Sequence, residues 1–279
     1  MSSSIKAVAL KACRHFMMPV ARFLLGVGVG YKEFAEISKL AFVQVASDEY
    51  GLRGRKTNMS RVSIMTGLNR KEIRKIRARL LHEDWSLDPD LSKPSSVLTK
   101  WFTDPRYLGA RGSPKWLSFE AAPRKASFSE LVKEVGGDLP PGAMLKELAR
   151  AGCVVEVRPG IWKAVKRQYS PAGIDLFQVQ RFGECLHDLA DTITKNYTTN
   201  EEGGEKLFEF RAWADGVQHK ATPALRQIVS SQGEAYLESV DDWLGAHLIS
   251  SEDHSGATAG VRCGVGVYYF ESREEDQVA

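Results

Sequence analysis

Residues 61–81 read RVSIMTGLNRKEIRKIRARLL, and this stretch decides the fold predicted for the N-terminal part of the 279-residue chain. It predicts two short helices joined by Gly67-Leu68-Asn69, because glycine favours the left-handed backbone that ends a helix. Asn58 or Ser60 is expected to begin the first helix. Asn69 followed three residues later by Glu72 is a capping pattern for the second. The stretch is therefore predicted to be a helix-turn-helix.

The apolar residues of this stretch lie where a helix-turn-helix needs an inner face. Val62 precedes the turn and Leu68 follows it. At about 100° per residue, one side of the second helix carries Ile73, Ile76 and Leu80. The opposite side is left to polar side chains.

Basic residues are concentrated in the same part of the sequence. Residues 53–79 hold ten bases and one acid, a net charge of +9, whereas the whole chain carries +3. From residue 233 to the end, ten acids and two bases make a net charge of −8, so that part would be repelled by a polyanion. The ten bases are the predicted DNA-binding residues: Arg53, Arg55, Lys56, Arg61, Arg70, Lys71, Arg74, Lys75, Arg77 and Arg79.

The outer face of the second helix points to nucleic-acid recognition, because a helix with such a face fits a major groove about 12 Å wide. Lys71, Arg74 and Lys75 lie on that face. The flanking phosphates are the expected partners of Arg53, Arg55, Lys56 and Arg61. The acids that usually balance a charged surface helix are missing, and a polyanion would relieve the repulsion. RNA contact and plain surface charge remain the alternatives.

The chain is expected to form three parts. Residues 1–90 are predicted to be a helical helix-turn-helix DNA-binding domain, 91–170 a second winged-helix-like domain, and 171–279 a C-terminal α+β assembly region with an acidic tail. The predicted fold class is mainly α with small β hairpins: winged helix-turn-helix domains plus a C-terminal α+β region.

Two helices are expected before the motif. The first is predicted to break at Pro19 and to end at Gly26, and its apolar positions are Ile5, Val8, Ala12 and Phe16. The second is predicted over 31–47, with an inward face of Phe34, Ile37, Ala41 and Val45.

The middle of the chain predicts helices near 97–102, 128–136 and 141–150, followed by a hairpin of 153–157 and 161–165. Helix, helix, hairpin is the order of a winged helix. The helix at 141–150 carries Lys146 and Arg150 beside Glu147 and lacks a surrounding basic field. Packing or dimer formation is therefore favoured over base reading for this unit.

The C-terminal part predicts helices over 174–197 and 223–248 and strands at 207–213 and 261–270. The apolar face of the second helix beside the last strand predicts a homodimer. Core packing is favoured over an inducer pocket for six aromatic residues: Phe208, Phe210, Trp213, Trp243, Tyr268 and Tyr269. An effector ligand stays unassigned.

Several classes of protein are not expected. The four cysteines form no CxxC pair, so we expect buried free thiols rather than disulfides or a zinc site. No HExxH, Walker or GxSxG motif occurs, which favours a protein without a metal, a cofactor or enzymatic activity. The longest uncharged apolar run, residues 23–31, is about half of a bilayer-spanning helix. A cytoplasmic, nucleoid-associated protein without membrane contact is expected.

Residues 61–81 resemble winged helix-turn-helix DNA-binding proteins. Over nearly its whole length, the chain is similar to a bacterial, mainly proteobacterial, family of unknown function. Besides the motif, this similarity rests on CRHFMMPVARFLL at 13–25, GYKEFAEISKLAF at 30–42 and RCGVGVYYF at 262–270. The resemblance implies a predominantly bacterial cytoplasmic protein with a helical winged-helix body, and it implies no activity.

Motif and charge together predict a DNA-binding transcriptional regulator whose N-terminal unit reads double-stranded DNA as a homodimer. The alternatives are a nonspecific nucleoid-associated or architectural DNA-binding protein and an adaptor that grips an acidic protein partner. A regulator prefers one operator over bulk DNA, an architectural protein does not, and an adaptor ignores DNA.

Overall fold

The described part of the chain is mainly helical and contains one small antiparallel sheet of three strands. The prediction of a mainly α protein with a small β hairpin is confirmed. A computed structural model describes residues 4–51, 55–82, 92–109, 112–121, 125–136, 138–167, 169, 175–202, 204–249 and 260–272. The chain divides into two compact units, residues 1–179 and 180–279. The first unit holds two separate hydrophobic cores.

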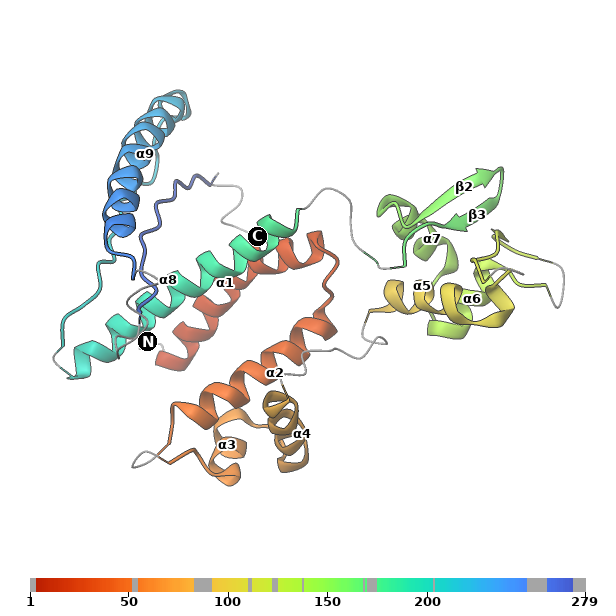
Figure 1. Ribbon diagram of the computed structural model, residues 1–279, viewed down its shortest axis with the longest axis horizontal. Coiled ribbons are helices and arrows are strands. Elements are labelled where there is room, and N and C mark those ends of the chain that lie inside the picture. Colours follow the sequence, from red (N-terminus) through yellow and green to blue (C-terminus); the bar gives the residue numbers. More distant parts are fainter. Residues whose placement is uncertain are drawn as a thin grey trace. The chain divides into compact units, whose positions relative to one another are not determined.

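Helix α1 (Ile5–Gly26) is continuous (Figure 1). It runs through Pro19, so the predicted break is wrong. A proline removes one backbone donor, and a helix of 22 residues keeps its other hydrogen bonds on both sides of that position. None of the residues of α1 is buried.

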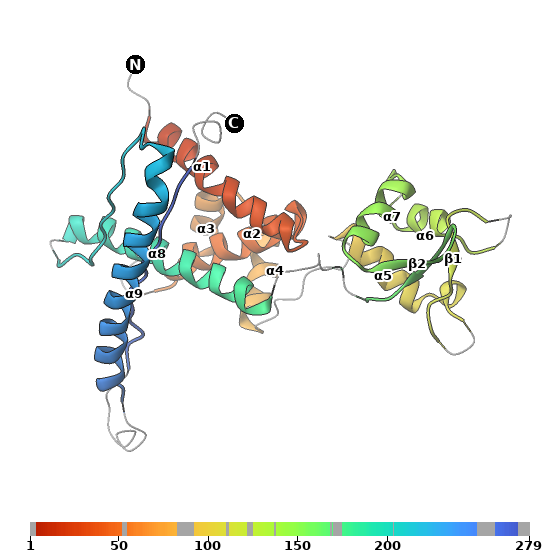
Figure 2. The ribbon, with the colours of Figure 1, turned by 90° about the horizontal axis from the view of Figure 1, so that it is seen from above.

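Helices α2 (Tyr31–Asp48), α3 (Met59–Thr66) and α4 (Arg70–Leu81) pack against one another (Figures 1 and 2). The predicted inner residues Val62, Ile73 and Ile76 are buried, and Leu68 and Leu80 are partly buried beside them. From α2, the same small core takes Leu40, Val43 and Ala46.

The predicted inward face of α2 is wrong. Ile37 and Val45 are 40% and 41% exposed, whereas Leu40 and Val43 are buried. Apolar residues lie on more than one side of this helix, so helical periodicity fits two faces equally well. The packing of α3 and α4 selects the face that is buried.

A second core is built by helices and strands between residues 92 and 167. The elements are α5 (Lys93–Thr103), the short 3-10 helix η2 (Pro105–Tyr107), β1 (Leu117–Ser118), α6 (Phe128–Gly136), α7 (Pro141–Arg150), β2 (Val154–Arg158) and β3 (Ile161–Ala164). The strands lie in the order β1-β3-β2, all antiparallel, with Leu117 opposite Trp162 and Val154 opposite Ala164. The predicted helices and hairpin are confirmed, whereas β1 was not predicted.

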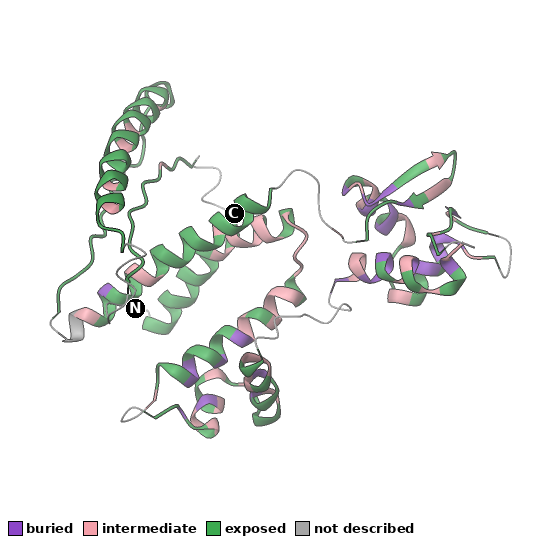
Figure 3. Ribbon diagram, in the orientation of Figure 1, coloured by how far each residue is buried: buried purple, intermediate pink, exposed green. Residues whose placement is uncertain are grey.

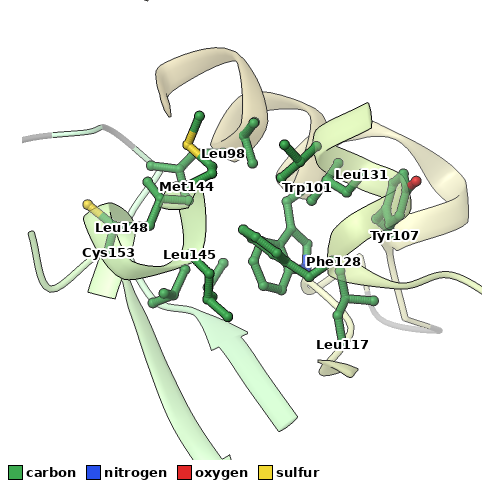
Figure 4. Close-up of a cluster of buried hydrophobic side chains, with 14 of the residues drawn as sticks. Leu98, Trp101, Tyr107, Leu117, Phe128, Leu131, Met144, Leu145, Leu148 and Cys153 are labelled. Carbon is green, nitrogen blue, oxygen red and sulfur yellow. The ribbon is translucent and has the colours of Figure 1, made fainter. Parts of the chain in front are cut away.

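Aromatic side chains fill the centre of this second core. Trp101 and Phe128 face each other with ring centroids 5.6 Å apart, and both are fully buried (Figure 4). The indole N–H of Trp101 donates to the carbonyl of Lys115 at 3.0 Å, so its one polar atom is satisfied. Leu131 and Leu148 pack beside the rings.

The C-terminal unit has helices but no strand among its described residues. Helix α8 (Leu176–Glu202) begins just before the unit boundary, and the short 3-10 helix η3 (His219–Ala221) leads into α9 (Thr222–Ala246). Residues 204–214 and 260–272 are extended in Figure 1 and form neither helix nor strand. The two predicted strands are therefore wrong, because neither segment has a strand to pair with.

Few residues of the C-terminal unit are buried (Figure 3). Among the described residues of 180–279, Asn196 alone is buried. Phe208 and Phe210 are 81% and 84% exposed, so the predicted aromatic core is absent from the single chain. The expected buried thiols are found at Cys153 alone, since the other three cysteines, Cys13, Cys185 and Cys263, are exposed.

Candidate nucleic-acid interface

The turn between α3 and α4 is held by side-chain caps. The Asn58 side chain accepts from the Arg61 backbone N–H at 2.9 Å at the start of α3, and Gly67, with φ of 74°, ends that helix. The Asn69 side chain accepts from the Glu72 backbone N–H at 2.9 Å and begins α4. These are the predicted caps, and they set the direction in which α4 leaves the turn.

Ser63 adds a further restraint on the turn, because its hydroxyl donates to the Leu68 carbonyl at 2.7 Å. Because the Ser63 side chain is small, the turn can lie close to α3. The path of the chain from α3 into α4 is therefore fixed by short-range hydrogen bonds and by the buried Val62 and Ile73.

The single acid of the basic window is used within the fold. The carboxylate of Glu72 lies 2.9 Å from the ammonium of Lys39 on α2, which also pairs with Glu36 at 2.7 Å. Hydrogen bonds to Glu36 and then to Glu72 hold the pKa of Lys39 above its usual value. Glu72 is thus directed toward α2 and does not balance the bases on the outer face of α4.

Lys71, Arg74 and Lys75 form the outer face of α4, and all three are exposed. Within the part of the chain that the structure describes, their side chains have no hydrogen-bond or ion-pair partner. The residues beside them in sequence, Ile73 and Ile76, point into the core. A phosphate or a base edge can therefore be bound by these cations without breaking an internal contact.

Other predicted interface residues have partners inside the protein. Lys56 pairs with Asp48 at 3.0 Å, and Arg70 donates to the Ser60 hydroxyl at 2.9 Å. Both side chains are exposed, so each of these contacts costs little to exchange.

Arg77 has a structural role. Its guanidinium donates to the Ser47 hydroxyl at 3.2 and 2.9 Å and to the Thr57 carbonyl at 2.7 Å, tying α4 to α2 and to the segment before α3. Neither partner is signalled by the sequence, since they lie 30 and 20 residues away. We therefore leave Arg77 out of the interface.

The remaining predicted bases differ in how far their side chains are exposed. Arg55 is exposed, and Arg61 and Arg79 are half-buried. Arg53 lies outside the described residues. The outward cationic set that the structure supports is therefore Arg55, Lys71, Arg74 and Lys75, with Arg61 at its margin.

The corresponding helix of the second core, α7, differs in its electrostatics. Lys146 is exposed, but Arg150 pairs with Glu147 at 2.7 Å, and the Tyr169 hydroxyl also donates to that carboxylate. Hydrogen bonds from Arg150 and then from Tyr169 hold the pKa of Glu147 below its usual value. Helix α7 therefore presents little uncompensated charge.

Cations next to the β2–β3 hairpin are also engaged internally. Lys166 donates to the Ala151 carbonyl at 3.4 Å, and the Arg167 guanidinium lies 5.3 Å from the centre of the Phe102 ring. Lys163 on β3 is exposed. The hairpin thus offers fewer available charges than its sequence suggests.

The described residues contain no group of three or more His, Cys, Asp or Glu side chains placed to hold a metal ion. None of the described helices combines the length and the apolar character that crossing a membrane requires.

The fold and the cationic face define a mainly helical protein whose N-terminal helices present uncompensated positive charge. The chain belongs to the family of unknown function DUF6502, whose model matches residues 5–277. No curated protein and no solved structure matches it.

Proposed function

We propose that this chain is a DNA-binding transcriptional regulator in which α4 is the recognition helix. The observation that carries the proposal is the outer face of α4. Lys71, Arg74 and Lys75 are exposed there and have no partner among the described residues, while the opposite side of the helix is buried. Cations in this arrangement release the counterions of DNA, and a helix of this kind fits the major groove.

The positions of these residues on α4 support base reading. Recognition helices contact base edges through their N-terminal residues, and Lys71, Arg74 and Lys75 lie within the first two turns after the Asn69 cap. Lysine and arginine side chains bind the O6 and N7 atoms of guanine. We assign phosphate contacts to Arg55 and Arg61, and to Lys56 and Arg70 after they exchange their weak internal partners.

We assign residues 92–167 to the winged-helix class as part of the same proposal. Its support is the order helix, strand, helix, helix, strand, strand and the sheet order β1-β3-β2, with the β2–β3 hairpin as the wing. Because Arg150, Lys166 and Arg167 are engaged internally, this unit is proposed to pack rather than to read bases. A regulator of this kind acts in the cytoplasm, at the nucleoid.

The decisive experiment compares two sets of alanine substitutions in the full-length chain. An operator is first found by genome-wide pull-down and footprinting. The Lys71→Ala, Arg74→Ala and Lys75→Ala triple variant should lose about 1–3 kcal/mol of operator binding for each residue that reads a base edge. Its folding should change little, because these side chains are exposed and alanine is a good helix former.

The matched control is the Lys146→Ala and Arg150→Ala double variant of α7, which should keep operator binding. If the control loses binding while the triple variant keeps it, with both shown folded by circular dichroism, the recognition helix lies in the other unit. Equal affinity of the unaltered chain for every duplex would indicate an architectural protein. Failure to bind DNA, with retention of an acidic protein, would indicate an adaptor.

A further inference from the structure

The helices of the C-terminal unit carry exposed apolar side chains. On α8, Leu186, Leu189 and Ile193 recur at helical spacing, and all three are exposed. On α9, Leu225 and Ile228 lie three residues apart, and both are also exposed. Amphipathic helices are stable when their apolar stripe is buried against another element. Among the described residues of 180–279, no element buries these side chains of α8 and α9.

The two extended segments of this unit have almost no backbone pairing. In the part of the chain that the structure describes, the backbone N–H groups of residues 261–271 have no acceptor. In residues 204–214, Leu207 alone is paired: its N–H donates to the Asn196 side-chain oxygen at 2.8 Å, and its carbonyl accepts from the Asn196 amide at 3.0 Å. Unpaired edges of this kind are templates for another strand.

The last segment is nevertheless held in place along α8 and α9. Arg262 pairs with Asp188 of α8 at 2.6 Å, and Arg226 of α9 pairs with Glu271 at 2.8 Å. Midway between them, a Cβ atom built on Gly233 of α9 would lie 3.5 Å from the side chain of Val267. Residues 261–271 are therefore held in position, and among the described residues their backbone N–H groups have no acceptor.

We infer that the missing partner is a second copy of this chain, and that residues 260–270 pair antiparallel with themselves across a two-fold axis near Val265. The sequence around Val265 is symmetric in character: the residues two positions away are Cys263 and Val267, and those four positions away are Val261 and Tyr269. An antiparallel self-pairing brings these apolar residues opposite one another, as an isologous contact requires.

Glycine and charge fit the same arrangement. No described heavy atom lies within 4 Å of a Cβ built on Gly264 or Gly266, so a neighbouring strand can approach the middle of the segment closely. Residues 260–272 contain one base and one acid, and residues 204–214 contain two of each. Neither segment therefore repels its own copy. The inference rests on the C-terminal unit and is independent of DNA binding.

Light scattering without DNA tests this pairing in the full-length protein. The unaltered chain should have twice its mass of 31.0 kDa at micromolar concentration. Val265→Lys should raise the dissociation constant of the dimer by roughly 100-fold or more, because each copy would bring a lysine into the apolar contact. Val265 is 44% exposed in the single chain, so the lysine should leave the helix content unchanged. The matched control is Ile64→Lys on α3, where the isoleucine is 83% exposed, and it should stay dimeric.

Hydrogen exchange gives a second readout that does not depend on a variant. Pairing predicts that every second amide of 261–269 is protected at concentrations where the protein is dimeric and loses this protection on dilution. A monomeric unaltered chain at high micromolar concentration would overturn the inference. So would a dimer in which these amides exchange freely, or a Val265→Lys chain as dimeric as the unaltered one. The Lys71→Ala, Arg74→Ala and Lys75→Ala variant should remain dimeric, which separates this result from the proposed DNA binding.

Discussion

Two pairs of helices in this chain, α3 with α4 and α6 with α7, differ in how they use charge. The first pair packs on a small core, and the outer face of α4 carries three exposed cations without a partner among the described residues. The second pair belongs to a larger core with a sheet, and Arg150 of α7 is bound by an acid one turn away. The comparison shows that similar helix arrangements need not share a surface chemistry.

The second pair also sits beside a network of four ion-paired side chains, Lys100, Asp104, Arg106 and Glu134. Glu134 of α6 lies 3.0 Å from Lys100 and 2.6 Å from Arg106, and Arg106 also binds Asp104 at 2.7 Å. On α4, by contrast, the acid Glu72 is directed toward Lys39. Arg150 and Glu134 of the second pair are used for internal contacts, whereas Lys71, Arg74 and Lys75 of α4 are left available for a partner.

The largest expected effect is on the stability of the second core. Phe128→Ala removes a fully buried ring packed against Trp101, and the cavity should cost about 3–5 kcal/mol. Hydrogen exchange should show lost protection in α5, α6 and α7, with α2, α3 and α4 unchanged. Equal loss of protection in both sets of helices would show that the two cores unfold as one cooperative unit, which would break the comparison.

A smaller effect distinguishes base reading from phosphate contact in the first pair. Arg74→Ala should weaken operator binding by about 1–3 kcal/mol and relax sequence preference, because a base-edge contact is lost. Arg55→Ala should weaken binding to all duplexes alike and lower the salt slope by about one, as the loss of a phosphate contact does. Salt titrations on operator and bulk DNA measure both. If both variants lose the same affinity on operator and bulk DNA, with the same salt slope, Arg74 does not read bases while Arg55 contacts only phosphate.

The next effect separates structural from available arginines on α4. Arg77→Met removes donors to Ser47 and to the Thr57 carbonyl and should lower the free energy of unfolding by about 1–2 kcal/mol, given that the side chain is half-buried. Lys75→Met on the exposed face is the control and should change it by less than about 0.5 kcal/mol. Urea unfolding of both variants measures this. If the Arg77→Met chain keeps its stability but binds DNA more weakly, Arg77 contacts DNA instead of stabilising the fold.

The smallest effect is on the acid stability of the second core. Hydrogen bonds from Arg106 lower the pKa of Asp104 to about 2, so ionised Asp104 stabilises the fold above its usual pKa of about 3.9, and this stabilisation is lost as the pH falls toward 2. Asp104→Asn should lower the urea midpoint slightly at pH 7 and reduce its fall between pH 4 and pH 2. An unchanged pH dependence in the variant would mean that this network does not contribute to stability.

Much of the first pair of helices could be predicted because its determinants are local. Asn58, Gly67 and Asn69 act on backbone groups within four residues of themselves, and Val62 and Ile73 are buried as helical spacing predicts. The outward position of Lys71, Arg74 and Lys75 follows from the same helical geometry. Local hydrogen bonds and helical periodicity are properties of a sequence, and no distant segment competes with them.

The rest depends on packing between distant segments. The buried face of α2 was chosen by α3 and α4, and the partners of Arg77 lie 30 and 20 residues away. The two-residue strand β1 is too short to show a period, and it forms because β3 supplies its hydrogen bonds.

The C-terminal unit shows the same division most clearly. The alternation at 261–270 predicts a strand, but a strand exists only where a neighbour pairs with it. The sequence by itself therefore determined the caps, the turn and the cationic face of α4. Tertiary structure alone decided which apolar faces are buried and which extended segments become strands, because both require a second surface that local sequence does not contain.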